Sequence, residues 1–472
     1  MTGTALPPVL VMQTRRMGDL ILTFPLLLAL QRLLPGHPLW VVGEAAFFKP
    51  LMPLAPQVVF FPPGHLPVLA RQRYRLAINL SPSVEAADCL ANVEADIKLG
   101  LMRQPGGLRV AGHWQLYRLA LTQNNHHNCF HWADLFRMDV VPHSQWPGFE
   151  RMHPRPPHGK IIGLVLGASE PGKRPSVRFW THLARILVGE GLVPILLGGP
   201  AEREMGEEVA RQLHLPKINS CGKLHLGETA ALMRSLSLCI TPDTGPMHLA
   251  DWLNVPVLDL SMGPVEARET GPVSPGQYVL RPAMSCVGCW QCQRGKYPCR
   301  QLFSPAAVAR VALSLLRQEP LSETAKQLHG LRLLQSGRDA LGLYRLTPLV
   351  PPATGSPASA RSMLEAFWRA VFLGDVIPGQ QAEARAHAAQ LARDHPRLHH
   401  RLRLALARLC STCAGGLKRS GSTLPPAFWH AHPPMLRLFA GHLHMTLQNE
   451  DFSPAAWQKI LSRLTAANTL LA

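Results

Sequence analysis

The sequence predicts an α/β protein with two doubly wound domains, followed by an all-helical appendage. Three observations predict this class. Short apolar runs of the length of buried strands alternate with helical patterns, the alternation stops at a Pro-rich segment and starts afresh, and beyond a second linker only helical spacing remains. Such alternation indicates parallel strands with helices on both faces of each sheet. With 472 residues the chain is also too long for one ordinary core.

The first domain is predicted over residues 1–152 and the second over residues 153–346. In the first, strand-like runs span residues 8–12, 39–42 and 75–80, and an apolar helix spans residues 20–34. The second begins with the Pro-rich linker 153–159 and repeats the pattern. Its predicted strands are 160–166, 193–197, 238–241 and 255–260, and its predicted helices are 179–190, 201–213 and 247–253. Two such domains create a cleft, and their ligands bind at the carboxyl ends of the strands.

Residues 347–472 form the predicted linker and appendage. The linker, residues 348–362, is rich in Pro, Ala, Ser and Gly. Helical spacing without strands follows over residues 363–372, 380–392, 398–410, 434–447 and 455–464. The sequence assigns no role to this part.

The composition limits the partners that can be expected. The formal net charge is +18, which favours anionic partners such as phosphorylated small molecules or acidic lipid surfaces. We expect no nucleic-acid partner, because no nucleic-acid-binding motif accompanies the charge. No secretory signal is recognised and no apolar run approaches the roughly 20 residues of a membrane span, so a cytoplasmic protein is expected.

Polar residues follow four of the predicted strands. Asp19, after the tight turn at Gly18, could act as a general base, or it could only cap the next helix. Ser169 with Lys173 and Arg174 suits a phosphate-bearing ligand, although any α/β loop can have such a composition.

The other two strand ends point to a nucleotide. Glu202 could bind ribose hydroxyls or merely favour the helix dipole. In the fourth motif, Asp243 or Thr244 can cap a helix, Gly245 lets a ligand approach the backbone, and His248 lies one turn further on. The free N–H groups at this helix start could seat a pyrophosphate.

These motifs, taken in order, resemble glycosyltransferase family 9, which includes the ADP-heptose:lipopolysaccharide heptosyltransferases. The resemblance covers about residues 9–308, roughly two-thirds of the chain. Each motif alone is weak, but several of them in one order make the resemblance specific. The residues that carry it are Met17–Leu26, Gly167–Ser169, Lys173–Arg174, Gly198–Glu202, Asp243–Ala250, Gly263–Pro264 and Thr270–Pro272.

The resemblance implies a GT-B fold of two Rossmann-like domains, with the acceptor on the first and the nucleotide sugar on the second. It implies an inverting enzyme that moves heptose from ADP-heptose to the acidic lipopolysaccharide inner core at the inner face of the cytoplasmic membrane, without a cofactor. In that picture Asp19 takes the acceptor's proton and Lys173 stabilises the departing diphosphate. The implied donor-binding residues are Ser169, Arg174, Glu202, Asp243, Thr244, Gly245 and His248.

The sequence departs from the family pattern at one motif. The family follows its Lys with a Trp-Pro pair, but Pro175 and Ser176 stand there in this chain, and Trp180 comes five residues later. A sugar other than heptose is therefore left open.

Four cysteines lie within fourteen residues with the spacing C-x2-C-x2-C-x6-C: Cys286, Cys289, Cys292 and Cys299. Thiolates so close together could ligate structural zinc or an iron–sulfur cluster, or they could serve only local packing.

Two alternative functions stay open for the chain: a nucleotide-sugar-binding relative that has lost catalysis, or a metal or redox protein built on this cysteine cluster. The second leaves the four strand-end motifs unexplained.

Overall fold

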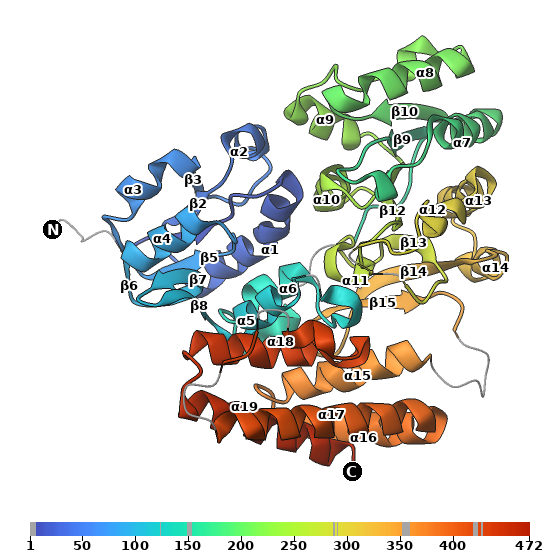
Figure 1. The fold of residues 1–472 in the computed structure, drawn as a ribbon. Helices are drawn as coiled ribbons and strands as arrows, with labels where there is room; N and C mark the ends of the chain where they lie inside the picture. Colours follow the sequence, from blue (N-terminus) through green and yellow to red (C-terminus); the bar gives the residue numbers. More distant parts are fainter. Residues whose placement is uncertain are drawn as a thin grey trace.

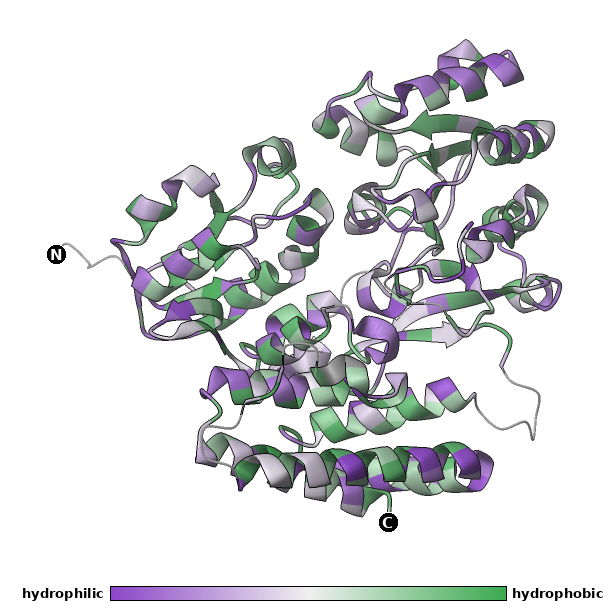
Figure 2. Cartoon of the chain, viewed as in Figure 1, coloured by the Kyte–Doolittle hydropathy of each residue, from purple (hydrophilic) through white to green (hydrophobic). Residues whose placement is uncertain are grey.

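The computed structural model describes residues 6–122, 124–148, 153–286, 288–289, 291–351, 359–418, 423–425 and 428–472. It has two α/β lobes side by side, with a layer of C-terminal helices beneath them (Figure 1). The central strands of both sheets are apolar along their length, whereas the surface helices mix apolar and polar faces (Figure 2). The predicted class, two doubly wound sheets and a helical appendage, is confirmed.

Six described strands form the sheet of the first lobe, in the order β3-β2-β1-β5-β7-β8. All pairs are parallel except the β7–β8 hairpin. The strands are β1 (Val9–Met12), β2 (Leu39–Val42), β3 (Val59–Phe61), β5 (Leu76–Asn79), β7 (Lys98–Gln104) and β8 (Gly107–Ala111). The helices are α1 (Met17–Leu33), α2 (Ala45–Leu51), α3 (Leu66–Leu69), α4 (Val84–Asn92), α5 (His113–Ala120) and α6 (Trp132–Arg137). A small separate ladder pairs β4 (Arg73–Tyr74) with β6 (Glu94–Ala95).

Seven described strands form the second sheet, in the order β10-β9-β11-β12-β13-β14-β15. The sequence patterns missed its antiparallel end, where β14 and β15 follow the parallel strands. The strands are β9 (Ile161–Val165), β10 (Val193–Leu197), β11 (Leu238–Pro242), β12 (Val257–Leu260), β13 (Tyr278–Pro282), β14 (Leu331–Arg338) and β15 (Tyr344–Pro348). The helices are α7 (Val177–Gly189), α8 (Arg203–Leu213), α9 (Leu226–Met233), α10 (Gly245–Trp252), α11 (Ala267–Thr270), α12 (Pro298–Gln301), α13 (Pro305–Leu316) and α14 (Leu321–Lys326).

The appendage shares its hydrophobic core with the first lobe. Trp368 stacks on Phe439 within the appendage, and Phe372 meets Tyr117 of α5 with ring centroids 4.7 Å apart. The helices are α15 (Ala360–Leu373), α16 (Gln380–Asp394), α17 (Pro396–Leu417), α18 (Pro434–Asn449) and α19 (Pro454–Leu470). Part of the predicted linker before them, residues 352–358, lies outside the described residues.

A buried carboxylate ties the first lobe to the second. Asp134 of α6 accepts a hydrogen bond from the backbone N–H of Tyr344 at 2.7 Å and pairs with Arg137 and Arg338 at 3.0 and 3.1 Å. Burial opposes its ionisation, but the two arginines outweigh burial and lower the pKa of Asp134 to about 2. The Asp134 carboxylate therefore stays ionised, and both arginines pair with a charged group.

We expect Asp134→Asn to lower the free energy of unfolding by about 3–5 kcal/mol, because it leaves two buried guanidinium groups short of a counter-charge. The depressed pKa means that the stabilisation by Asp134 is present above the ordinary carboxyl range and is lost as pH falls toward about 2. Denaturant titration measures both effects. The control is Asp88→Asn, which breaks an exposed pair with Arg103 and should change stability by less than about 1 kcal/mol.

Candidate active site

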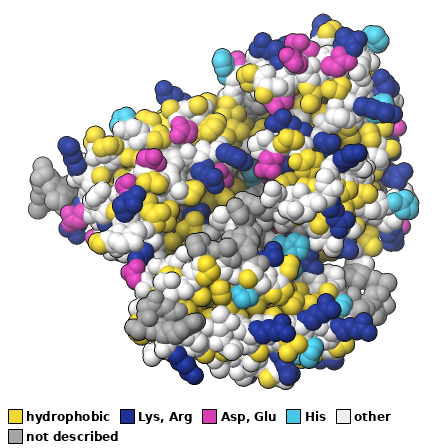
Figure 3. Space-filling model, in the orientation of Figure 1, with side chains coloured by type: hydrophobic (Ala, Val, Ile, Leu, Met, Phe, Trp, Pro, Cys, Tyr) yellow, Lys and Arg dark blue, Asp and Glu magenta, His cyan; other side chains and the backbone are white. Residues whose placement is uncertain are grey.

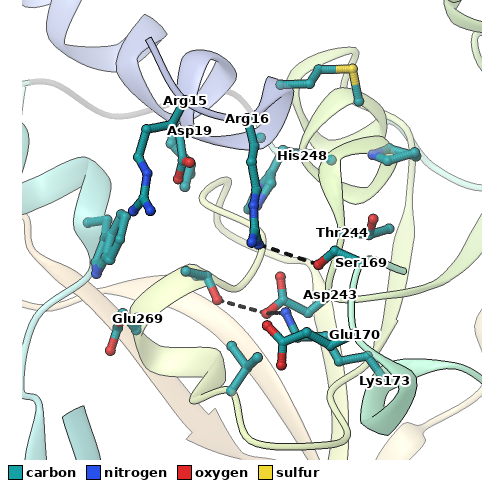
Figure 4. A pocket seen from close by; sticks show the side chains of 18 of the residues that line it. Arg15, Arg16, Asp19, Ser169, Glu170, Lys173, Asp243, Thr244, His248 and Glu269 are labelled. Atoms are coloured by element: carbon teal, nitrogen blue, oxygen red, sulfur yellow. Dashed lines mark hydrogen bonds and ion pairs between the residues drawn. The ribbon is translucent and has the colours of Figure 1, made fainter. Parts of the chain in front are cut away.

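A cavity with a volume of about 630 Å³ lies between the two lobes. Helix α1 of the first lobe and helix α10 of the second start at this cavity (Figure 4). Two glycines let the helix starts approach: a Cβ on Gly18 would lie 2.9 Å from the His248 ring, and a Cβ on Gly245 would lie 2.6 Å from the Met17 methyl group. A larger side chain at Gly18 would clash with the buried His248 ring, whereas one at Gly245 would displace the Met17 methyl group.

Both helix starts present backbone N–H groups that their own N-cap side chains do not occupy. Among the described residues, neither Arg16 of α1 nor Thr244 of α10 caps its helix through its side chain. A helix start carries partial positive charge and unsatisfied donors. Arg15, Arg16 and Lys173 line the same cavity and add full positive charges. The cavity therefore suits an anion, in particular a phosphate group.

Asp19 stands in the first turn of α1 and faces the cavity (Figure 4). Burial raises its pKa, while Arg15 and His248 act in the opposite direction. A carboxylate with a raised pKa is a better proton acceptor than one in water. His248 is itself buried, and burial lowers the pKa of its imidazole, so it is neutral near pH 7.

Across the cavity, Lys173 and Asp243 form a pair that a third side chain fixes. Lys173 is in the 3-10 turn Pro171–Lys173, and its Nζ lies 3.7 Å from Oδ2 of Asp243. The Thr270 hydroxyl donates to the same oxygen at 2.9 Å. Both charged side chains are more than nine-tenths buried, so an anion in the cavity would meet a held ammonium group rather than a mobile one.

The structure brings most of the sequence-predicted site residues together. Those lining the cavity are Asp19, Ser169, Lys173, Asp243, Thr244, Gly245 and His248. Ser169 also accepts a hydrogen bond from Arg16 at 3.4 Å, which links the lobes. Two predicted residues do not line the cavity. Glu202 accepts from the backbone N–H of Gly199 at 2.9 Å, and Arg174 donates to the carbonyl groups of Ala168 and Ser169, so both hold their own loops.

Trp180 does not replace the Trp of the family pattern. It belongs to α7 and is fully buried in the core of the second lobe. Ser176, which stands in the pair's place, instead accepts from the backbone N–H of Phe179 at 3.2 Å and caps α7.

Sequence reasoning missed several residues that line the cavity: Arg15, Arg16, Asn125, Trp132, Glu170, Glu269 and Thr270. The two arginines directly precede a helix that begins at a strand end, and this position could have identified them. Asn125, Trp132 and Glu269 follow no predicted strand, so no pattern marked them.

The four clustered cysteines line one small enclosed cavity of about 20 Å³. Burial, and then the other three thiols, raise the pKa of Cys289. Among the described residues, no group of three or more His, Cys, Asp or Glu side chains is arranged to hold a metal ion. The cysteine segment packs on the turn that carries Lys173: Arg300 donates to the carbonyl groups of Pro171 and Arg174 at 3.3 and 3.2 Å.

Two facing α/β lobes with an anion-binding cavity between them define the GT-B class. Residues 68–297 match the model of glycosyltransferase family 9 (heptosyltransferase). Over these residues, just under half of its length, the chain is similar to glycosyltransferase family 9.

Curated heptosyltransferases are similar to part of this chain, and a solved structure shares its fold. Lipooligosaccharide heptosyltransferase 2 of Haemophilus influenzae is 31% identical over 128 residues, which are 26% of this chain and 36% of that protein. Lipopolysaccharide heptosyltransferase 2 of Escherichia coli is 31% identical over 126 residues, again 26% and 36%. The match thus spans about a third of these relatives. A family 9 glycosyltransferase from Veillonella parvula shares the fold, with a TM-score of 0.54 and 22% identity over 67% of this chain and 99% of that one.

Proposed function

We propose that this protein is an inverting glycosyltransferase that moves heptose from ADP-heptose to the inner core of lipopolysaccharide. One observation carries the proposal: a single cavity holds a carboxylate from one lobe, Asp19, opposite a buried lysine and an open helix start from the other. A proton acceptor facing an anion seat is what a direct displacement at a sugar phosphate requires.

In the proposed reaction the acceptor hydroxyl attacks the anomeric carbon, whose bond to the diphosphate oxygen breaks. The hydroxyl proton passes to Asp19, and the bonding electron pair leaves with the diphosphate. Lys173 and the N–H groups at Thr244 and Gly245 stabilise the negative charge that develops there. No metal is needed for this step, because these groups supply the positive charge.

The remaining donor contacts follow from position. Ser169, Asp243 and His248 line the cavity and would orient the diphosphate and sugar. Glu202, in the 3-10 turn Pro200–Glu202 that follows β10, would accept hydrogen bonds from ribose hydroxyls once its carboxylate turns away from the Gly199 N–H group. Arg174 would brace the loop at Ala168 and Ser169. The first lobe, which supplies Asp19, would hold the acceptor.

Calorimetric titration of ADP-heptose, ADP and UDP tests the donor assignment. We expect ADP-heptose and ADP to bind, and we expect Lys173→Ala to lower their affinity about tenfold, which corresponds to about 1.4 kcal/mol of binding free energy. Asp19→Asn should leave binding nearly unchanged while lowering the transfer rate about 10²–10⁴-fold, since only the proton acceptor is lost. Binding without transfer by the wild type would favour the inactive relative. No nucleotide binding by folded protein would contradict the proposal.

The cysteine cavity supports a second, structural proposal. Four thiols around one small space are a donor set that suits zinc, or less readily an iron–sulfur cluster, provided that the side chains turn inward on binding. A metal there would fix the segment that packs on the Lys173 turn.

Metal analysis with visible absorbance tests this proposal. We expect one zinc ion per chain, lost in Cys289→Ser because one of four thiolate ligands is removed. Cys410→Ser, on the distant helix α17, is the matched control and should keep the metal. Protein that stays free of metal after incubation with zinc would show that the thiols serve packing alone.

The acceptor would be an acidic glycolipid, and we propose peripheral contact with the anionic inner face of the cytoplasmic membrane. In the described part of the chain, no helix is both long and apolar enough to cross a bilayer. Helix α17 has no acidic residue and exposes Arg397, Arg401, Arg403 and Arg408, with Leu404 45% exposed among them. Lys and Arg gather over α16 and α17 on the face that also shows the cleft between the lobes (Figure 3).

Sedimentation with anionic vesicles tests this contact. Each cation near an anionic surface contributes about 1 kcal/mol, so R397Q/R401Q/R408Q should weaken binding about a hundredfold. Neutral vesicles should not bind the wild type. The control triple variant removes three exposed arginines from the second lobe: Arg178, Arg310 and Arg332. If the control variant loses as much vesicle binding, the effect comes from net charge alone, and the assignment of the membrane contact to α17 is contradicted.

A further inference from the structure

We propose that Asn125, Trp132 and Glu269 form a subsite that reads the hydroxyl groups of the sugar being transferred. The inference rests on the proposed function, because it concerns the donor of the same reaction. It adds a surface that contacts the sugar to the start of α10, where the diphosphate would bind.

The three side chains form one wall of the cavity, although they come from three separate segments. Asn125 is in the 3-10 turn Asn125–His127, Trp132 begins α6, and Glu269 is in α11. Glu269 lies on the opposite flank of the cavity from Ser169 and Thr244 (Figure 4). A donor whose diphosphate rests on the α10 start would therefore direct its sugar toward this wall and toward Asp19.

Polar atoms of the wall lack partners that a sugar would supply. The Oδ1 atom of Asn125 is buried and makes no hydrogen bond among the described residues. The Nε1 atom of Trp132 is also buried without a hydrogen bond of regular geometry, although the Trp132 side chain interacts with the Glu269 carboxyl group. Asn125 as a whole is 2% exposed. A buried polar atom without a well-formed hydrogen bond is destabilising, so a ligand bearing several hydroxyl groups would relieve both. The indole ring adds an apolar surface for the carbon face of a sugar.

Glu269 complements them as a hydrogen-bond donor. Burial raises its pKa to about 8 against hydrogen bonding from Asn128, Asn125 and Trp132. The Nδ2 atom of Asn128 donates to Oε2 of Glu269 at 3.3 Å. The carboxyl group is therefore neutral below about pH 8 and can donate its proton to a hydroxyl oxygen. The titratable or charged groups around it are Glu266 and Tyr117 in the protein interior, and Arg15, Asp19, Lys173, Asp243 and His248 along the cavity.

The appendage holds this wall in place through buried ion pairs. Glu266, just before α11, pairs with Arg281 at 2.7 Å and with Arg361 of α15 at 2.6 Å. Arg268 within α11 pairs with Glu365 of α15. Glu269 and Thr270 thus follow a segment anchored from two sides, which favours a preorganised wall.

The test compares the affinity for ADP-heptose with the affinity for ADP in the full-length protein, since their ratio isolates the sugar. We expect Glu269→Ala and Asn125→Ala to lower the ratio about tenfold while ADP affinity changes less than twofold. In the wild type the ratio should fall as pH rises through about 8, because the neutral acid becomes a carboxylate. Glu269→Gln, a permanently neutral donor, should keep the ratio and abolish its pH dependence. Glu85→Gln, an exposed carboxyl on α4, is the control.

The outcomes separate this inference from the proposed function. A wild type that binds neither ligand overturns both. Normal ADP binding with a ratio unchanged in Glu269→Ala and Asn125→Ala overturns the subsite alone. Equal losses for ADP and ADP-heptose also overturn it, because they mark the wall as structural.

Discussion

The close approach of the first turns of α1 and α10 is the constraint on which the rest of the site depends. Each helix begins just after a strand that ends at the cleft, and a glycine in each first turn allows the N-termini of α1 and α10 to lie together. Two positive helix ends and three cations then surround one cavity. The carboxylates of Asp19 and Asp243 stand among these charges: Asp19 faces the cavity, and Asp243 holds Lys173 in place.

The sequence patterns predicted seven of the parallel strands, because these buried strands are short, apolar and regularly interrupted by helices: β1, β2, β5, β9, β10, β11 and β12. They missed the parallel strands β3, β7 and β13. They also missed β14 and β15, which follow the cysteine segment and pair antiparallel, outside the repeating unit. The strand-end rule found Asp19, Lys173 and the Asp243 motif because parallel strands end at one edge. It could not tell that the Glu202 carboxylate bonds its own loop, which depends on a side-chain rotation that no spacing records.

Sequence reasoning could not find the proposed sugar subsite of Asn125, Trp132 and Glu269, for a different reason. Asn125 and Trp132 come from the last part of the first lobe, and Glu269 comes from a single short helix turn of the second. Their proximity exists only after both lobes and α15 have packed. The ion pairs from Arg361 and Glu365 to the α11 segment show that the appendage, which had no predicted role, belongs to the architecture of the site.

The shared core of α5, α6 and the appendage also has a consequence for biosynthesis. Tyr117 and Trp114 belong to one cluster with Phe372, Phe439 and Trp457, so the first lobe completes the burial of these early aromatic rings only against helices that follow the second lobe in the chain. A nascent chain leaving the ribosome would expose part of that apolar surface throughout synthesis of the second lobe.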